Sequence, residues 1–523
     1  MTLSLERRAA LWGDRTAVVD ASADRRVSYA DLESEADAMA RRLAALGVGP
    51  GDPVAVVSRN RIETLALLFA VRRLGGIFAP VSHRLTPATV EEPLETIDPE
   101  VVVHEAGQRD LVRELPDERT HSFEELGRHE GADYESVDRD AEDSLVYLHT
   151  KAEADRPAVG EDEGRSRPGE SLNEDPTTAP RVVDYPARAV EWNCVTAAAA
   201  WGLGRGDCAP ALLPFSDADG LLGLVLPLLY VGGRVALLRA FRPEDALAAV
   251  AEEGATALFA GATEYRELVA ADEFAATDFS GVEWIATRSR LPADAREELA
   301  RHAPVVRTYG RVETGPNALF VPPGESGSAA DAPDRDADRV GRPFPDCEVR
   351  VAADDGTPVE DGELGEIRCR GAVTPKGRLT DDGTTETFPD WVPTGDLGFR
   401  EGGDYYLLGR ASEAFESGES AASAESADST DPARVHPREV ERALESEPDV
   451  TAAGVVPDDE GVLAAFVGDA DPGELRGTLA DSLPEGVAIR ELNRVESLPR
   501  RATGELDRAA LRRQLDDEER IDE

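Results

Sequence analysis

Short buried strands alternate with amphipathic helices through the first 105 residues, and this alternation restricts the possible folds strongly. Runs of branched apolar residues predict strands at 54–57, 77–81 and 101–103. Apolar residues spaced three and four apart predict helices from Asp31 to Gly47, at 63–74, and after Thr86, where Pro87 takes the first helical position. Because crossover helices join parallel strands, the sequence predicts a parallel sheet covered by helices.

A second block with the same alternation runs from about residue 211 to residue 308. Its apolar runs predict strands at 235–238, 257–259, 284–286 and 305–308, with helices at 221–230 and after Pro243. Tyr309 and Gly310 follow the last of these strands. Open α/β sheets bind ligands at the carboxyl ends of their strands, so this loop is a candidate site. Glu313, a little further on, either holds Mg²⁺ or faces solvent.

The pattern changes after residue 340. Short runs separated by turn residues predict a small β-barrel up to residue 410. A helix at 437–444, strands at 450–456 and 462–467, and a helix near 475–479 then predict an α+β unit. The expected fold class is α/β, with a large N-terminal domain (1–410) of two α/β subdomains plus a small β-barrel, and a small α+β C-terminal domain (411–523).

Two polar stretches interrupt this organisation, at 151–176 and 416–434. The first is acidic with almost no large apolar side chains, and the second consists mainly of Ser, Ala, Glu and Asp. Neither contains enough apolar surface to offset the entropy of ordering. We expect both to be flexible insertions within loops.

The charge balance of the chain limits its partners. It has 56 basic and 105 acidic residues, which argues against nucleic acid and anionic membranes as partners. Only two lysines occur, Lys151 and Lys376. Such an acidic, lysine-poor composition suits a salt-rich cytosol, where charge repulsion is screened to within a few ångströms. We therefore expect a halophilic protein that unfolds at low salt.

Cysteine and histidine usage points to the cytoplasm and away from a protein-built metal centre. The four cysteines form no CxxC pair, and we expect free thiols in a reducing cytoplasm. The seven histidines show no metal-binding spacing. No apolar run reaches the roughly 18 residues that a bilayer span needs.

The stretch from Pro393 to Gly398, followed by Tyr405 to Arg410, carries the most specific chemistry. It combines a Thr-Gly-Asp turn with a short strand that ends in Gly-Arg. Glycine lets a backbone approach a ligand closely, Asp396 can accept hydrogen bonds from a ribose diol, and Arg410 can fork onto a phosphate. Taken alone, the same residues also fit a plain β-hairpin with a surface Asp and Arg.

This stretch resembles the TGD…GR signature of the adenylate-forming (AMP-binding) superfamily, which includes AMP-forming acyl- and aryl-CoA synthetases. Three further stretches resemble that family in the same order, at 309–314, 435–441 and 498–508. The resemblance implies a large domain that binds ATP and a carboxylic acid, and a mobile C-terminal domain that rotates about a hinge near 412–413. It implies ATP, Mg²⁺ and CoA as cofactors and co-substrates, and an acyl-adenylate as the intermediate.

The resemblance also implies roles for individual residues. Asp396 would hold the ribose hydroxyls, Arg410 would assist at ribose or phosphate, and Tyr309, followed by Gly310, would lie near the adenine. Glu313 would bind the magnesium on the triphosphate. A second group of implied ligands comprises a CoA-tunnel glycine and the remnants of a phosphate loop: Gly418, Thr150, Thr177 and Thr178.

Several family positions are altered in this chain. The acidic stretch separates Thr150 from Thr177, and Ala179 and Arg181 stand where the phosphate loop has Gly and Lys. Glu505 stands where the family has a lysine that meets the carboxylate and the α-phosphate, and we do not expect it to replace that lysine. Further altered positions are Val312, Ser216 and 287–289. Arg500, Arg501 or Arg508 could supply the missing charge.

The sequence thus leaves more than one function open. The first is an AMP-forming carboxylic acid–CoA ligase, with aryl or medium-acyl acids such as o-succinylbenzoate as candidates. The alternative is a catalytically impaired ligase-fold protein that binds nucleotide or acts as an interaction subunit. In an intermediate case, only the thioester half-reaction survives.

Overall fold

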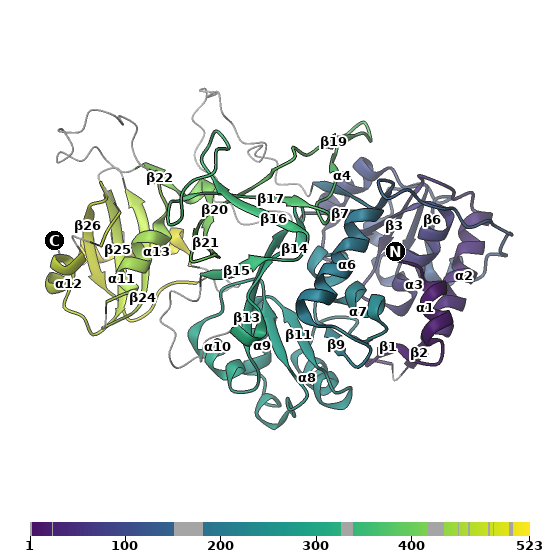
Figure 1. The fold of residues 1–523 in the computed structure, drawn as a ribbon, viewed down its shortest axis with the longest axis horizontal. Coiled ribbons are helices and arrows are strands. Elements are labelled where there is room, and N and C mark those ends of the chain that lie inside the picture. Colours follow the sequence, from purple (N-terminus) through teal and green to yellow (C-terminus); the bar gives the residue numbers. More distant parts are fainter. Residues whose placement is uncertain are drawn as a thin grey trace.

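A computed structural model of the chain describes residues 3–23, 25–150, 181–325, 338–416, 434–447, 449–458, 461–479, 482–484, 486–500 and 506–522. Figure 1 shows a large body formed by the N-terminal four-fifths of the chain and a smaller C-terminal unit at one end of it. Within the described residues, no helix is both long and apolar enough to cross a bilayer.

The first large sheet contains the strands predicted at the start of the chain. Its eight strands have the order β19-β18-β8-β7-β4-β3-β5-β6. Their bounds are β3 (Pro53–Val57), β4 (Ile77–Val81), β5 (Val101–His104), β6 (Thr120–Ser122), β7 (Ser144–His149), β8 (Val182–Pro186), β18 (Gly377–Leu379) and β19 (Thr385–Thr387). Strands β7, β4, β3, β5 and β6 are parallel, which confirms the predicted parallel sheet.

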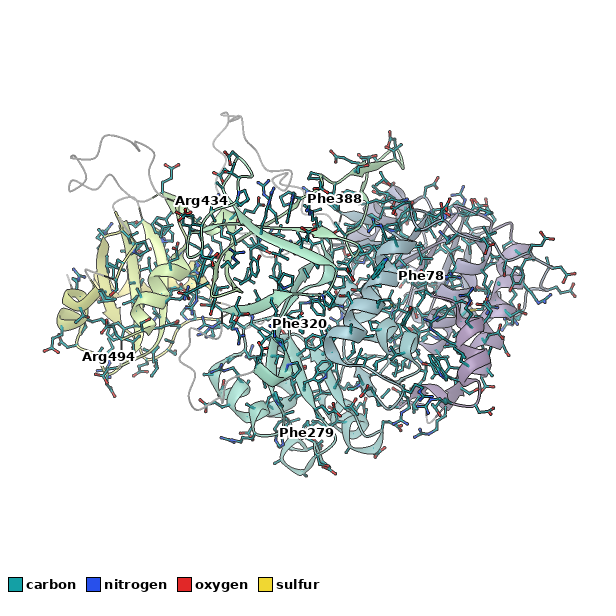
Figure 2. All side chains as sticks on the ribbon, viewed as in Figure 1. Phe78, Phe279, Phe320, Phe388, Arg434 and Arg494 are labelled. Atoms are coloured by element: carbon teal, nitrogen blue, oxygen red, sulfur yellow. The ribbon has the colours of Figure 1, made fainter. Side chains whose placement is uncertain are left out.

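Helices cover this sheet as expected. They are α2 (Tyr29–Ala45), α3 (Ile62–Leu74), α4 (Pro87–Ile97), α5 (Phe123–Leu126) and α6 (Ala187–Trp201). Phe78 of β4, labelled in Figure 2, lies inside this part of the core and has no exposed surface. The predicted start of α2 at Asp31 is wrong by two residues. Ser28 caps the helix, because its hydroxyl accepts from the Asp31 backbone N–H while the Asp31 carboxylate accepts from the Ser28 N–H.

The N-terminal hairpin joins the second α/β block, which the sequence did not indicate. A four-stranded sheet has the order β2-β1-β10-β9. Its strands are β1 (Thr16–Asp20), β2 (Arg25–Ser28), β9 (Cys208–Ala211) and β10 (Arg234–Leu237), with α1 (Leu5–Trp12) at the chain start. The predicted helix at 221–230 is a π-helical segment, Asp219–Val225, followed by α7 (Leu226–Val231).

A nine-stranded sheet continues the second block. Its order is β11-β12-β13-β14-β15-β21-β20-β17-β16. The bounds are β11 (Ala257–Ala260), β12 (Trp284–Thr287), β13 (Val305–Arg311), β14 (Gly315–Phe320), β15 (Arg339–Pro343), β16 (Cys347–Ala352), β17 (Gly365–Gly371), β20 (Val392–Glu401) and β21 (Asp404–Arg410). Its accompanying helices are α8 (Pro243–Glu252), α9 (Ala262–Ala270) and α10 (Ala293–Ala300).

Most strands expected to form a small β-barrel, namely β15, β21, β20, β17 and β16, are the second half of this sheet, whereas β18 and β19 belong to the eight-stranded sheet. Hairpin β13–β14 carries the ladder from the parallel strands directly into the antiparallel ones, so the two regions share one sheet. The sheet curls, since its edge strand β16 contacts β14 and β15. Among the described residues no ladder joins β16 to β14, and the curl is therefore not closed by strand pairing.

The C-terminal unit, residues 434–522, has its own three-stranded sheet of order β24-β25-β26. Its elements are β23 (Arg434–Val435), α11 (Pro437–Glu445), β24 (Val450–Asp458), β25 (Gly461–Gly468), α12 (Pro472–Thr478), β26 (Ile489–Arg494) and α13 (Arg508–Asp522). The predicted helices and strands are confirmed, whereas β26 and α13 were not predicted. Strand β23 pairs with β22 (Phe415–Glu416), so both ends of the proposed insertion 416–434 meet in one ladder. Residues 417–433 and 151–180 lie outside the described residues.

His436 lies where the C-terminal unit meets the Gly409-Arg410 pair. Its side chain has no exposed surface, and its Nδ1 accepts from the Arg438 backbone N–H at the start of α11. A Cβ added to Gly409 would lie 2.8 Å from two ring atoms of His436, so this contact requires glycine. Burial, aided by the nearby Arg508 guanidinium, lowers the pKa of His436 to about 4.

Acidification should therefore weaken the fold through His436. The folded state keeps the imidazole neutral, while the unfolded chain binds a proton below about pH 6.5. The contribution of His436 to stability is complete above that pH and is lost progressively as the pH falls toward 4. Between about pH 7.5 and 5 we expect a loss of about 2 kcal/mol in the free energy of unfolding.

Urea denaturation in about molar KCl measures this effect. The variant His436→Asn keeps an acceptor at the start of α11 and should lose about 2 kcal/mol of the pH dependence relative to the unmodified chain. His302→Asn, at an exposed histidine, serves as the matched control. Equal pH dependence in the unmodified chain and His436→Asn would contradict the assignment.

Candidate nucleotide site

The Thr-Gly-Asp segment on β20 is fixed by its neighbours on β17. The Thr394 hydroxyl donates to the Ile367 carbonyl over 2.7 Å and accepts from the Asp396 N–H over 3.1 Å. The Gly395 N–H donates to the Glu366 carboxylate over 2.9 Å. Gly395 has a φ of +68°, which favours glycine. This backbone presents Asp396 directly opposite Arg410 in the β20–β21 ladder.

Asp396 is the centre of a buried polar cluster. Its side chain accepts from the Tyr309 hydroxyl over 2.8 Å at Oδ2 and from Arg410 Nη1 over 3.0 Å at Oδ1. Arg311 Nη1 lies 3.3 Å from Oδ2. Asp396 is only 5% exposed. Tyr309 and Arg410, which the sequence also singled out, therefore both contact the carboxylate of Asp396. Tyr309 and Asp396 lie 87 positions apart in the chain.

Arg311 was missed by the sequence analysis, although strand periodicity could have identified it. Residues two apart on a strand share a face, and Tyr309 and Arg311 both reach Asp396. Gly310 between them leaves no room for a side chain, because a Cβ there would lie 2.4 Å from the carbonyl oxygens of Gly315 and Pro316. Burial and the adjacent Asp396 raise the pKa of Tyr309, so its hydroxyl stays a neutral donor.

The cluster can accommodate a diol only by rearranging. An ionised carboxylate offers about four acceptor positions, and three donors already occupy positions on Asp396. A ribose diol would bring two more. The contact from Arg311 is the longest of the three, so this guanidinium is the group that a ribose would displace.

Glu313 lies on the Nε side of the Arg311 guanidinium. It is 8% exposed, with Oε2 3.7 Å from Arg311 Nε and Oε1 3.6 Å from Arg378 Nη2. Neither distance is a hydrogen bond. The side chain therefore fits a single position on a Mg²⁺ ion that is otherwise held by phosphates and water, as is usual for Mg²⁺ with nucleotides. In the described part of the chain, no three His, Cys, Asp or Glu side chains are grouped to form a metal site.

Thr150 and Arg181 flank the stretch 151–180, which lies outside the described residues and is predicted to stand where the family has a phosphate loop. Strands β7 and β8 are antiparallel, with His149 opposite Val182. The Thr150 N–H donates to the Arg181 carbonyl over 2.8 Å, and the Arg181 N–H donates to the Thr150 hydroxyl over 3.0 Å. The acidic stretch thus leaves and re-enters the sheet at one point. Thr177 and Thr178 lie outside the described residues.

Glu505 and Gly418 also lie outside the described residues, but the flanks of Glu505 are described. Arg500 and Leu506 form a β-bridge, and the Asp507 N–H donates to the Pro499 carbonyl over 2.9 Å. Arg508, considered above as a substitute for the missing lysine, contacts the carboxylate of Glu441 and the Val455 carbonyl within the C-terminal unit. In this arrangement the positive charge of Arg508 is paired within the C-terminal unit.

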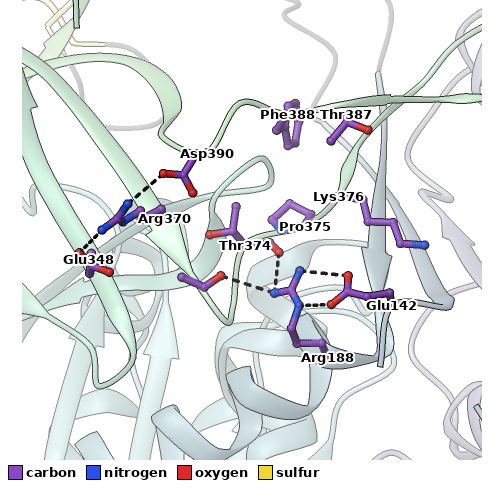
Figure 3. A pocket seen from close by; sticks show the side chains of 11 residues that line it. Glu142, Arg188, Glu348, Arg370, Thr374, Pro375, Lys376, Thr387, Phe388 and Asp390 are labelled. Carbon is purple, nitrogen blue, oxygen red and sulfur yellow. Dashed lines mark hydrogen bonds and ion pairs between the residues drawn. The ribbon is translucent and has the colours of Figure 1, made fainter. Parts of the chain in front are cut away.

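A cavity of about 510 Å³ lies elsewhere, between β17, α6 and the segment before β18 (Figure 3). None of the predicted site residues lines it. Its charged side chains already form pairs: Arg188 with Glu142 at 2.7 Å, and Arg370 with Glu348 and Asp390 at 2.8 and 2.9 Å. Lys376 donates to the Ser144 hydroxyl over 3.1 Å. We therefore interpret the cavity as a structural gap whose charged side chains already pair with one another.

Comparisons of the sequence with a family model and with known proteins agree with one another. The family model described as AMP-binding enzyme matches residues 5–377. The indoleacetate–CoA ligase of Aromatoleum aromaticum is 27% identical over 86% of this chain and 84% of its own length. The 2-succinylbenzoate–CoA ligase of Bacillus licheniformis is 25% identical over 97% of this chain and 98% of its own.

Solved structures agree in fold. Apo MatB from Rhodopseudomonas palustris superimposes with a TM-score of 0.76 at 22% identity, covering 99% of both chains. The o-succinylbenzoate coenzyme A synthetase MenE from Bacillus subtilis, in complex with AMP, gives a TM-score of 0.71 at 22% identity and 98% coverage of both. The likeness extends over nearly the whole chain, including the C-terminal unit.

Proposed function

Because this chain belongs to the AMP-binding enzyme family, we propose that it is an AMP-forming carboxylic acid–CoA ligase. In the first step, an oxygen of the acid attacks the α-phosphorus of ATP, and the bond to pyrophosphate breaks. In the second, the sulfur of CoA attacks the acyl carbon, and AMP leaves with the carboxyl oxygen. The observation that carries the proposal is the convergence of Tyr309, Asp396 and Arg410 in one buried cluster.

Each residue of this cluster has a different role in nucleotide binding. Asp396 accepts hydrogen bonds from the ribose hydroxyls, and Arg410, which also contacts the Thr394 carbonyl, holds that carboxylate in place. Tyr309 donates to Asp396 and keeps it oriented. Glu313 would take one position on Mg²⁺, which when bound neutralises charge on the phosphates. Gly418 is proposed to contribute to the CoA tunnel, and Thr150, Thr177 and Thr178 to contact the phosphates.

The acid is proposed to be an aryl or arylalkyl carboxylic acid. The names of relatives support this class, since they include indoleacetate–CoA ligase, feruloyl-CoA synthase and 2-succinylbenzoate–CoA ligase. The test is to incubate the chain with ATP, Mg²⁺, CoA and each acid of a panel in about molar KCl. We expect AMP and the matching acyl-CoA in equal amounts with at least one aryl acid. Acid-independent AMP release, or none with any acid, would count against the ligase.

A second candidate function is a ligase-fold protein that binds nucleotide but does not adenylate. The observation that favours it is Glu505 at the position of the family lysine. A cation facing developing negative charge typically contributes a few kcal/mol to catalysis, and a carboxylate there adds repulsion. The match of the chain to CoA ligases over nearly its full length favours the ligase.

Replacing Glu505 with lysine should therefore speed adenylation. We expect Glu505→Lys to raise acid-dependent exchange between ATP and pyrophosphate by about 10- to 100-fold, because it restores a charge of the favourable sign. Glu474→Lys, at an exposed position on α12, makes the same charge change and should leave the exchange rate unaltered. Equal rates for Glu505→Lys and the unmodified chain would remove residue 505 from the adenylating site.

Two features of the whole chain complete the proposal. We propose a division into domains at residues 410 and 411, with the hinge at 412–413, where the chain passes from β21 into a short 3₁₀ turn, Ala411–Glu413. We also propose a cytoplasmic protein adapted to high salt. A net charge of −49 and the scarcity of lysine support this, and unfolding on dilution into low salt is the expected result.

A further inference from the structure

Two arginines from separate segments flank Glu313, and a third, Arg181, lies two positions before the residue that pairs with one of them. Strand β18 pairs with β8 so that Arg378 lies opposite Val183, two residues after Arg181 at the loop base. Arg311 approaches from β13. Glu313 lies between Arg311 and Arg378, at 3.7 and 3.6 Å. We call Arg181, Arg311 and Arg378 the arginine cluster.

The groups of the cluster interact electrostatically. Burial lowers the pKa of Arg378. The carboxylates of Glu313 and Glu386 oppose that shift, whereas the like charges of Arg181 and Arg311 lower the pKa of Arg378 further. Glu386 lies opposite Arg378 on β19 and is exposed to solvent. Glu313 is thus the buried carboxylate between these guanidinium groups, and its distances to Arg311 and Arg378 are too long for hydrogen bonds.

The backbone at the loop base cannot supply the donors that phosphates need. The N–H groups of Thr150 and Arg181 already donate to each other's residue. The stretch between them contains acidic residues, which repel a triphosphate. Guanidinium groups are the alternative donors, because they stay charged and can form paired hydrogen bonds with phosphate oxygens.

The contacts of Arg311 indicate the direction in which the phosphates of a bound nucleotide would extend. Its Nη1 contacts Asp396, the proposed ribose ligand, and its Nε faces Glu313, next to Arg378. A nucleotide with its ribose on Asp396 would therefore extend its phosphates past Arg311 toward Arg378 and Arg181. The same ribose displaces Arg311 from Asp396, which frees this guanidinium to contact phosphate.

We propose that the arginine cluster binds the β- and γ-phosphates of ATP and takes over the task of the interrupted phosphate loop. This inference rests on the proposed nucleotide site at Asp396. Glu313 keeps Arg311 and Arg378 in position in the absence of nucleotide, at distances that an incoming phosphate can replace with direct hydrogen bonds.

Calorimetric titration of Arg378→Met with ATP, AMP and inorganic pyrophosphate tests the proposal. Methionine keeps most of the side-chain length and removes the charge. In about molar KCl, we expect the affinities for ATP and pyrophosphate to fall about 10-fold or more, and the affinity for AMP to change less than about 2-fold. Arg181→Met should lower the same two affinities, and it serves as the test if Arg378→Met does not fold.

Arg370→Met is the matched control, because Arg370 is paired with Glu348 and Asp390 away from the cluster. It should bind all three ligands like the unmodified chain. Undiminished ATP and pyrophosphate affinity in folded Arg378→Met or Arg181→Met would overturn the arginine cluster while leaving the ligase proposal in place. Pyrophosphate binding without AMP binding in the unmodified chain would support the cluster and contradict the nucleotide site. Binding of none of the three ligands would overturn both.

Discussion

Asp396→Asn is expected to lower the affinity for AMP by about 100-fold or more. Asparagine has the shape of aspartate but replaces one acceptor oxygen with a donor and removes the charge. Hydrogen bonds to a charged group contribute about 1.5–3 kcal/mol each, against about 1 kcal/mol for neutral pairs. Losing this difference at two ribose hydroxyls, and turning an NH₂ group toward Arg410 or Tyr309, amounts to about 3 kcal/mol.

Equilibrium dialysis with labelled AMP in about molar KCl measures this loss. Asp404→Asn is the matched control, since Asp404 lies on the same hairpin and pairs with Arg339 instead, at 2.7 Å. The control should retain the affinity of the unmodified chain. If Asp396→Asn bound AMP normally while its urea denaturation curve matched that of the control, Asp396 would not be the ribose ligand.

Arg438→Met is expected to lower the free energy of unfolding by about 3–5 kcal/mol. The Arg438 guanidinium lies 3.0 Å from Asp338, 2.6 Å from Glu445 and 3.5 Å from Glu441. All four side chains are at least nine-tenths buried, and Asp338 belongs to the segment that leads into β15, whereas the others are on α11. Removing the cation takes one positive charge away from three buried carboxylates at the contact between the C-terminal unit and the large body. Arg442, Arg508 and Arg290 remain near Asp338, Glu441 and Glu445 but do not replace these contacts.

Arg494→Met supplies the contrast for this measurement. Arg494 pairs with Asp469 at the surface of the C-terminal unit (Figure 2), and such exposed pairs contribute about 0–1 kcal/mol. Urea denaturation in about molar KCl should separate the two variants, because salt screens the exposed pair far more than the buried one. Losses of equal size would show that the buried network does not stabilise the contact.

Much of the fold could be predicted from the sequence because its elements are locally encoded. The apolar runs at 54–57 and 77–81 are buried on both faces of a parallel sheet, and the Thr86-Pro87 pair starts α4 as expected. The curled sheet could not be predicted in the same way. Whether strands after residue 340 close a barrel or extend an existing sheet depends on the β13–β14 hairpin, a pairing that no local pattern reports.

The site residues also separate into those that the sequence could predict and those that depend on tertiary structure. Tyr309, Asp396 and Arg410 were identified through family resemblance, and the structure brings their side chains together. Arg311 was missed although its spacing from Tyr309 could have identified it, whereas Arg378 was missed because its approach to Glu313 depends on tertiary geometry. Arg378 arrives there through a pairing between β18 and β8, which lie about 190 residues apart in the chain. For Thr177, Thr178, Gly418 and Glu505, the assignments remain predictions from the sequence.

Calorimetric titration of the unmodified chain with ATP-Mg²⁺ in about molar KCl is the decisive test of the nucleotide site, since it requires no knowledge of the acid. We expect saturable binding of one ATP per chain at the Asp396 cluster, in competition with AMP. A folded protein that binds neither ATP nor AMP would contradict it, and the cluster around Asp396 would then be a structural ion-pair network.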